Sequence, residues 1–412
     1  MSAILAGLRV VEVSAFVAAP LGGMTLAQLG ADVVQVSPIA GRIDTSRWPV
    51  TASGASLYWA GLNKGKRSIR LALDRPEGQE IAAALIAAPG EGGGIALTNL
   101  PARGWLSYAA LRARREDVIL LKLLGNADGS AAIDYTVNCA SGFPTATGTG
   151  AAPVNHVLPA WDVAAGLYLV AGLLAAERHR RITGQGQEVT TALSDVMLAT
   201  VGNLGFIAEV QVNGEQRPPL GNDLYGAFGR DFPTRDGRRV MVAAISDRQW
   251  RALCAATGLA DRLVHIEALM GVNLGDEGGR YHARDAIAAV LAPWFAARSL
   301  AEIAQAFAGT GVLWGPYQDF RQLVAEDPRC STANPLFREI DQPGVGRHLA
   351  PHAPLGFGAV PRGEVVPAPL LGQHTEEILA DVLGLPAAEI GRLMDGGIAA
   401  GMEPGAQPGS RT

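Results

Sequence analysis

Cysteine is scarce in this chain. Its 412 residues include three, Cys139, Cys254 and Cys330, which lie far apart. This spacing matches neither a disulfide framework nor a zinc site, so we expect reduced thiols in a cytoplasmic protein and no bound metal. A catalytic thiol at Cys139 is the alternative, although no histidine neighbours it in the sequence.

Charged residues are also few. They make up 18% of the chain and leave a net charge of −5, which excludes a general nucleic-acid-binding protein. Hydrophobic residues make up 48%, which indicates compact folding rather than disorder. The length is sufficient for two domains with buried cores.

Long uninterrupted apolar runs are absent. The apolar stretch over 13–34 follows Glu12 and is broken by Pro20 and two glycines, unlike a signal peptide. The longest run, after Asp162, stops at Glu177 and is shorter than the roughly eighteen residues of a membrane span. We therefore expect neither a leader segment nor a membrane contact.

The dinucleotide-binding pattern GxGxxG is missing, and GEGGG at 90–94 precedes an expected strand rather than a helix. Instead, short β-branched runs alternate with helical stretches, which predicts a parallel α/β sheet. Ligands of such sheets bind in the loops beyond the C-terminal strand ends. The expected strands span 7–14, 32–36, 67–73, 94–100 and 118–125, with a helix at 76–89.

Composition changes after the first two hundred residues. We predict a large Rossmann-like α/β domain, with 1–205 as its N-terminal part, and a linker over 206–235. A small α+β domain is expected over 236–318. Residues 319–412 are expected to form a second linker and return to the large domain, with a closing helix near 375–384.

Asp162 is the carboxylate of most interest. It stands in LPAWDVAAG (158–166), at the start of a long apolar helix expected over 163–181. Aspartate is common as a helix N-cap, and this alone would explain it. A helix N-terminus also favours an ionised carboxylate and can stabilise an oxyanion, so a nucleophile fits the same position.

The ordered set of motifs resembles the class III CoA-transferase family over nearly the whole chain. The matching segments are GLRVVEVSAFVAAP, LGADVVQV, NKGKRSI (63–69), DVAAG (162–166), ERHRRITGQGQEV (177–189) and LGQHTEEIL (371–379). The resemblance implies a homodimer of two interlocked subunits, each with a Rossmann-like large domain and a small domain. It also implies that Asp162 is the nucleophile and that coenzyme A is part of the substrate.

The chemistry follows from the functional groups. A carboxylate attacks a thioester carbonyl to give a mixed anhydride and CoA thiolate, which then attacks the aspartyl carbonyl to form an enzyme–CoA thioester. A free carboxylate reverses these steps, and no separate cofactor is required. Longer runs such as WAGLNKGKRSI and VNHVLPAWD favour a family member that moves CoA between the C1 and C4 carboxyl groups of mesaconate within one molecule. Mesaconyl-CoA is therefore the expected substrate.

Three other functions stay open. Transfer to a separate acceptor acid is poorly distinguished by sequence. An α-methylacyl-CoA racemase pairs the equivalent of Asp162 with a histidine directly before the equivalent of Asp134, but Ile133 stands there and cannot carry a proton. A non-catalytic CoA-binding protein is disfavoured because the aspartate motif is intact.

The resemblance also assigns a CoA-binding set: Val17, Ala18, Lys66, Arg67, Leu71, Asn99, Leu100 and Arg103. Without the resemblance, the basic NKGKRSIR segment (63–70) could equally be a solvated edge. The chain departs from the family where Ser37 and Pro38 replace a basic residue and where the segment after Asn99 is shortened. GNDLYGAFGRDF (221–232) replaces the family's glycine-rich loop.

Three residues are candidates for contacting the remaining substrate carboxylate. Arg47 offers a positive charge, and His156 is the only imidazole near the aspartate motif. For His156, a structural hydrogen bond is the alternative. Asp134 is interpreted as a polar anchor rather than a second catalyst.

Overall fold

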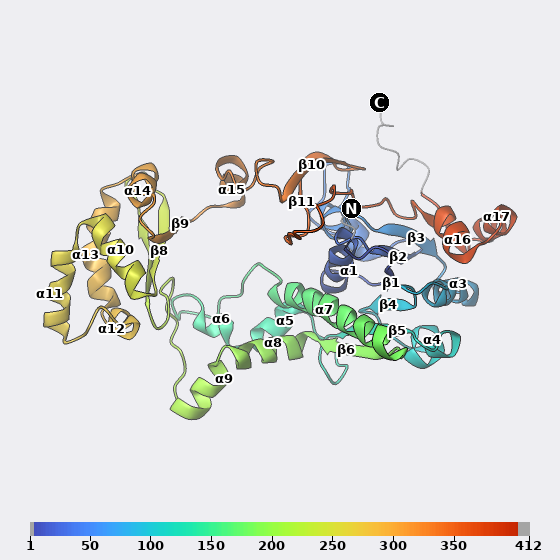
Figure 1. Ribbon diagram of the computed structural model, residues 1–412, viewed down its shortest axis with the longest axis horizontal. Helices are drawn as coiled ribbons and strands as arrows, with labels where there is room; N and C mark the ends of the chain where they lie inside the picture. The colour runs from blue at the N-terminus through green and yellow to red at the C-terminus, as the bar shows by residue number, and fades with distance from the viewer. Residues whose placement is uncertain (1–3, 403–412) are drawn as a thin grey trace. The chain divides into compact units, whose positions relative to one another are not determined.

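The computed structural model describes residues 4–402, which fold into two compact units (Figure 1). The first unit comprises Met1–Ser141, Val157–Ala208 and Pro328–Thr412, and the second comprises Gly142–His156 and Glu209–Asp327. Each unit is described by itself.

A seven-stranded sheet forms the centre of the first unit, in the order β12-β3-β2-β1-β4-β5-β6. Six strands are parallel, and β12 pairs antiparallel with β3. The order 3-2-1-4-5-6 is that of a Rossmann-type sheet, so the predicted α/β class is confirmed. The strands are β1 (Arg9–Val13), β2 (Asp32–Pro38), β3 (Arg67–Leu71), β4 (Ile95–Thr98), β5 (Ile119–Leu124), β6 (Glu188–Ala192) and β12 (Ala399–Ala400).

Two groups of helices pack on this sheet. One group is α1 (Ala18–Gln28), α7 (Ala160–Thr183) and α8 (Leu193–Asn203). The other is α3 (Pro76–Ala87), α4 (Tyr108–Arg114), α16 (Thr375–Leu383) and α17 (Ala387–Asp395), which share one apolar core with the strands. Strands β1 to β4 are short, apolar and almost fully buried, as expected for a sheet covered on both faces, whereas the edge strand β6 is partly exposed. The C-terminal residues thus contribute both helices and a strand to this unit.

The strand order reverses between β1 and β4, which lie side by side in the sheet. In open α/β sheets, the crevice beyond the strand ends at this switch point is the usual ligand site. The loop before α1 (14–17) and the loop that begins at Asn99 start there. This edge therefore contains the candidate site.

The first unit also contains several shorter helices and strands. Helical turn η1 (Ile43–Ser46) and helix α2 (Leu57–Leu62) lie between β2 and β3, while α5 (Asp134–Cys139) follows β5. Strands β10 (Phe337–Gln342) and β11 (Gly346–Pro351) form an antiparallel hairpin. The remaining short elements are η2 (Gly104–Leu106) and α9 (Phe206–Ala208).

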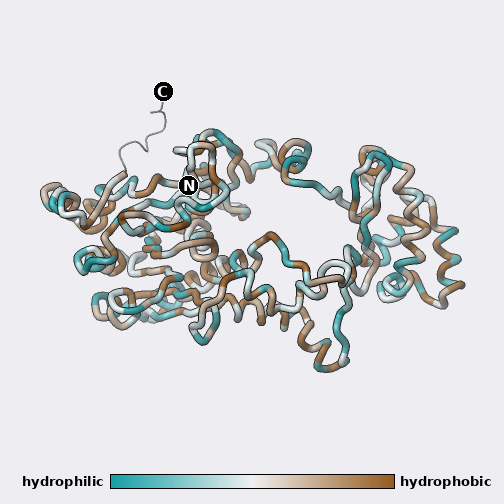
Figure 2. Tube along the Cα trace, turned by 180° about the vertical axis from the view of Figure 1, so that it is seen from behind, coloured by the Kyte–Doolittle hydropathy of each residue, from teal (hydrophilic) through white to brown (hydrophobic). Residues whose placement is uncertain are grey.

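The second unit is a small α+β unit with its own core. Its antiparallel sheet has the order β7-β8-β9, and helices pack against it through buried aromatic residues such as Phe228 and Phe295. The hydrophobic residues along its helices are visible in Figure 2. Its elements are α6 (Phe143–Ala146), η3 (Glu209–Asn213), β7 (Phe228–Pro233), β8 (Arg239–Ala244), α10 (Asp247–Thr257), α11 (Ala260–Met270), α12 (Glu277–His282), α13 (Arg284–Ala296), α14 (Leu300–Phe307), β9 (Leu313–Pro316) and α15 (Phe320–Glu326).

Helix α7 is long and apolar enough, by length and composition, to cross a membrane, and two bent helix pairs would raise the number of such spans to three. The helix extends beyond the apolar run between Asp162 and Glu177, which by itself is too short to cross a membrane. Within the first unit α7 packs against α1, β5 and β6 and buries Leu169 and Leu173. This packing accounts for the apolar composition of the helix.

Candidate active site

Asp162 lies in the first turn of α7, whose N-cap is Pro159. The interpretation of Asp162 as an N-cap was therefore wrong, because the helix begins three residues earlier than expected and Asp162 occupies its third position. Its side chain is partly exposed and accepts no hydrogen bond from any described residue. The carboxylate is thus free to act on a ligand.

The cap of α7 comes instead from Asp134, the first residue of α5. One oxygen of its carboxylate, Oδ2, accepts hydrogen bonds from the backbone N–H groups of Trp161 at 2.7 Å and of Asp162 at 3.1 Å. These two groups would otherwise lack partners at the helix start. Asp134 is 2% exposed. It is therefore a structural anchor whose negative charge lies beside Asp162.

The spacing Asp-x-x-x-Gly has a structural explanation. Residues four apart share a helix face, so Asp162 lies one turn before Gly166, which contacts α1. A Cβ atom at Gly166 would lie 2.6 Å from the carbonyl oxygen of Ala18, and one at Gly22 would lie 3.0 Å from the carbonyl oxygen of Gly166. The two glycines let the helices cross closely, which brings the start of α1 to the helix face that carries Asp162.

Burial raises the pKa of Asp162 to about 6, with the negative charge of Asp134 as the second cause and the positive charge of Arg47 opposing both. At pH 7 the carboxylate is still mostly ionised, by roughly ten to one. It is poorly solvated, which favours attack on a carbonyl carbon. A raised pKa is typical of a functional carboxylate.

Arg47, directly after η1, lies between two aromatic rings. Its guanidinium carbon is 5.4 Å from the ring centroid of Phe16 and 5.0 Å from that of Tyr58. The hydroxyl of Ser56 donates a hydrogen bond to the Arg47 carbonyl at 2.7 Å. Arg47 forms no ion pair with any residue in 4–402, although its charge acts on Asp162. A cation held near the nucleophile without a partner is suited to an anionic ligand.

Among the predicted CoA-binding residues, Asn99 has a side chain that binds the backbone of the loop after β1. Its side-chain amide donates to the carbonyl of Ala15 at 2.7 Å and accepts from the N–H of Ala15 at 3.0 Å. This clamp joins the ends of β1 and β4. Val17 and Ala18 follow at the start of α1, where their side chains are buried and their backbone faces the switch point. Leu100 is partly exposed beside them.

Arg103 is exposed, and its side chain forms no hydrogen bond or ion pair within the part of the chain that the structure describes. It follows the loop after β4, close to the switch point in sequence. Binding a ligand would therefore break no internal contact of Arg103, and its predicted contact with a phosphate group of CoA stays a prediction.

Lys66 and Arg67 have other partners. The ammonium group of Lys66 donates to Glu12 and to Asn63, and both side chains of the Lys66–Glu12 pair are at most 1% exposed. Arg67 pairs with Asp32 and Glu377. The alternative of a solvated edge is wrong for this segment, because three of its four cations are buried.

Leu71 is completely buried at the end of β3. The side chains of Lys66, Arg67 and Leu71 face the interior or ionic partners, and their predicted contacts with CoA stay predictions. The burial of Lys66 depends on Glu12, 54 residues earlier in the chain, which a local charge pattern does not reveal.

His156 belongs to the second unit, where its ring Nδ1 is buried without a hydrogen-bond partner. Its predicted substrate contact stays a prediction. The three cysteines form no disulfide, and Cys139 is exposed. Among residues 4–402 no cluster of histidine, cysteine, aspartate and glutamate could hold a metal ion.

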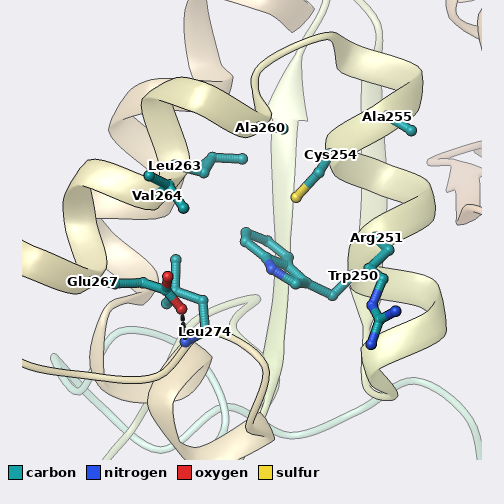
Figure 3. A pocket seen from close by; sticks show the side chains of 9 residues that line it. All are labelled: Trp250, Arg251, Cys254, Ala255, Ala260, Leu263, Val264, Glu267 and Leu274. Atoms are coloured by element: carbon teal, nitrogen blue, oxygen red, sulfur yellow. Dashed lines mark hydrogen bonds between the residues drawn. The ribbon is translucent and has the colours of Figure 1, made fainter.

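The second unit also has a pocket of about 320 Å³ between α10 and α11 (Figure 3). Trp250, Cys254 and Leu263 point into it, and the carboxylate of Glu267 accepts a hydrogen bond from the Leu274 N–H at 2.6 Å. Burial raises the pKa of the Cys254 thiol to about 11, so it stays protonated and is a poor nucleophile. This pocket lacks the groups for acyl transfer.

Phe16, Tyr58 and Asp44 were missed by sequence reasoning. Phe16 stands in the segment that carried the family resemblance, but nothing in its spacing signals a contact with Arg47. The Tyr58 hydroxyl is buried without a partner, and burial raises its pKa to about 12. Such contacts join segments far apart in sequence, and only the folded chain brings them together.

Comparison with known proteins identifies the family. The model of CoA-transferase family III matches residues 5–375. The chain is 58% identical over 404 residues to the 2-methylfumaryl-CoA isomerase of Chloroflexus aurantiacus, covering 97% of this chain and 99% of that protein. It is 28% identical over 396 residues to the succinyl-CoA:mesaconate CoA-transferase of Haloarcula marismortui, covering 90% and 94% respectively.

The fold is also found in solved structures. A CAIB/BAIF family protein from Brucella suis superposes with a TM-score of 0.75 at 25% identity, covering 93% of this chain and 100% of that one. The extent of the match includes both units.

Proposed function

This chain belongs to CoA-transferase family III, and from that premise we propose that it converts 2-methylfumaryl-CoA into 3-methylfumaryl-CoA. CoA would move from the C1 to the C4 carboxyl group of mesaconate within one molecule. The observation that carries the proposal is the 58% identity to an isomerase of this substrate over nearly the full chain. The unpaired Asp162 carboxylate at the switch-point edge supplies the required nucleophile.

We infer four chemical steps. The Asp162 carboxylate attacks the C1 thioester carbonyl, which gives a mixed anhydride and releases CoA thiolate. The thiolate attacks the aspartyl carbonyl, which forms an aspartyl–CoA thioester and frees mesaconate. The C4 carboxylate then attacks this thioester, which forms a second anhydride and releases CoA thiolate again. Finally the thiolate attacks the mesaconyl C4 carbonyl, which regenerates the Asp162 carboxylate.

Arg47 is proposed to hold whichever mesaconate carboxylate is idle. Its guanidinium is near enough to influence the pKa of Asp162 yet forms no ion pair within the described chain. Arginine binds carboxylates through two parallel N–H groups, which would also orient the acid. Retention of the freed acid keeps the acceptor at a high effective concentration.

CoA is proposed to lie across the ends of β1 and β4. Backbone groups of Val17 and Ala18, the Asn99–Leu100 segment and the exposed Arg103 form the proposed contacts. The first N–H groups of α1 have no side-chain cap and could bind a negatively charged oxygen. No other cofactor is needed, because a carboxylate and a thiolate suffice for each step.

Intermolecular transfer to a second acid is the alternative, and the likeness to the succinyl-CoA:mesaconate CoA-transferase favours it. The test mixes 2-methylfumaryl-CoA with excess isotopically labelled mesaconate and follows the 3-methylfumaryl-CoA product by mass spectrometry. Unlabelled product supports transfer within one molecule. Label that enters as fast as product forms would show that the acid leaves the site, and absence of any product would reject the proposed substrate.

We further propose an interlocked homodimer located in the cytoplasm. Exposed apolar side chains on the first unit support a subunit contact, among them Leu167 and Tyr168 on α7 and Leu198 on α8. Light scattering coupled to gel filtration would give twice the mass of one chain. A mass of about 43 kDa would contradict the dimer.

A further inference from the structure

The loop between β1 and α1 contains an unusual backbone conformation. Phe16 has a φ angle of 68°, and it is the only non-glycine residue in 4–402 with a positive φ. Residues with a side chain rarely adopt this conformation, and surrounding contacts must hold them there. Such outliers in a ligand-binding loop indicate a functional constraint.

Side chains from two other segments hold this loop. Asn99 binds both backbone groups of Ala15, at 3.0 Å and 2.7 Å. The carboxylate of Asp44 in η1 is 3% exposed, and the Phe16 backbone beside it partly offsets the burial that raises its pKa. The loop that carries Phe16 is thus flanked on both sides, by the end of β4 and by η1.

This backbone conformation places the Phe16 ring at the surface, beside Arg47. The ring is 44% exposed rather than packed into the core, and the Arg47 guanidinium lies 5.4 Å from its centroid. Tyr58 presents a second ring to the same guanidinium at 5.0 Å. Aromatic faces attract a guanidinium without using its N–H groups, which stay available for a ligand.

We propose that Phe16 is a positioning residue for Arg47 and thereby makes the site selective for CoA thioesters of dicarboxylic acids over those of monocarboxylic acids. This inference rests on the proposed function, which assigns the idle substrate carboxylate to Arg47. Asp44 and Asn99 contribute indirectly, because they flank the loop that carries Phe16.

The two rings are useful because Arg47 could otherwise form an ion pair with Asp162. A mobile arginine near an unpaired carboxylate would be drawn into an ion pair with it. Pairing with Asp162 would occupy the cation and weaken the nucleophile. Arg47, held by Phe16 and Tyr58, forms no ion pair with Asp162 in the structure. Its guanidinium therefore stays available to bind the substrate carboxylate.

The experiment uses the full-length chain with Asp162→Asn, so that thioesters bind without reacting. Calorimetry measures the dissociation constants of 2-methylfumaryl-CoA and of methacrylyl-CoA, which lacks the second carboxylate. The ratio of the two dissociation constants is measured for the Asp162→Asn protein and for Asp162→Asn proteins that also carry Phe16→Leu or Phe16→Tyr. Leucine keeps the apolar bulk but removes the aromatic face, whereas tyrosine keeps the face.

We expect Phe16→Leu to reduce the preference for the dicarboxylyl thioester about tenfold, mainly by weakening 2-methylfumaryl-CoA binding, and Phe16→Tyr to retain it. Tyr58→Leu removes the opposite ring without altering the loop and should cause a similar loss, so it decides the question if Phe16→Leu does not fold. An unchanged preference in the folded Leu variants would overturn the inference.

A second measurement separates positioning from a general structural effect. In the otherwise wild-type enzyme, Phe16→Leu should shift the acidic limb of the kcat/KM profile to lower pH, because a released Arg47 would stabilise the ionised Asp162. An unshifted limb would contradict the positioning role. If the wild-type enzyme does not isomerise 2-methylfumaryl-CoA at all, the proposed function fails; if it does and the preference is unchanged, only this inference fails.

Discussion

The carboxylate of Asp134 accepts a hydrogen bond from the backbone N–H of Asp162 at 3.1 Å, while its negative charge raises the pKa of the Asp162 side chain. One residue therefore fixes the start of α7 and also influences the protonation of the proposed nucleophile. The two effects can be separated, because an asparagine can accept the same hydrogen bond without a charge.

Asp134→Asn should lower the pKa of Asp162. The wild-type pKa is about 6, and kcat/KM should fall about tenfold per pH unit below it, because only the ionised carboxylate attacks. Removing a neighbouring negative charge favours ionisation, so the acidic limb should move to lower pH, while burial keeps the pKa above its ordinary value. An acidic limb that moves to higher pH, or does not move, would contradict the electrostatic coupling between Asp134 and Asp162.

Asp162→Asn should abolish isomerisation while the protein stays folded. An amide is a much poorer nucleophile than a carboxylate, and the expected loss is about 10³-fold or more in kcat. The comparison is with Asp195→Asn, an exposed acid on α8 that should keep full activity. Turnover of 2-methylfumaryl-CoA near the wild-type rate by a sample proven free of deamidation would remove Asp162 from the mechanism.

Gly166→Ala should reduce both stability and activity. The new Cβ would lie 2.6 Å from the Ala18 carbonyl oxygen, so α1 and α7 must move apart. Overpacking of this kind costs about 1–3 kcal/mol, and the shift would move the proposed CoA contacts away from Asp162. The expected result is a lower thermal midpoint with a lower kcat.

Gly172→Ala is the matched control on the same helix, because its new Cβ would meet a Val189 methyl group at an ordinary 3.5 Å. It should be neutral or slightly stabilising, since alanine favours helix. Equal losses for both variants would mean that the helix crossing at Gly166 has no special role.

Lys66→Met should destabilise the first unit strongly, because it leaves the buried Glu12 carboxylate without its cation. Loss of one partner of a buried pair typically costs about 3–5 kcal/mol. The double variant Lys66→Met with Glu12→Gln removes both charges and should recover much of the thermal midpoint. Lys122→Met, which breaks the partly exposed pair with Glu188, should cost at most about 1 kcal/mol. A double variant less stable than Lys66→Met would disprove the pairing argument.

Local pattern was sufficient to predict five strands of the first unit, β1 to β5, and its helices α3, α7 and α16. The β-branched runs at β1, β2 and β3 are short and continuous, and a parallel sheet buries both faces of such strands. The motif of Asp162 and Gly166 was also visible in the sequence, because residues four apart on a helix share a face. These features depend on neighbours in the chain.

The environment of each charge was decided by the tertiary structure. The basic segment at 63–70 indicated a CoA contact or a solvated edge, but Lys66 is buried against Glu12 and Arg67 pairs with Asp32 and Glu377. Asp162 was expected to cap its own helix, yet Asp134, 28 residues earlier, caps it. Arg47 lies between two rings that no spacing rule connects to it. The sequence therefore determines which groups are present and the strands and helices that carry them. Their pKa values and partners depend on desolvation and on charges brought close by folding, which act through space rather than along the chain.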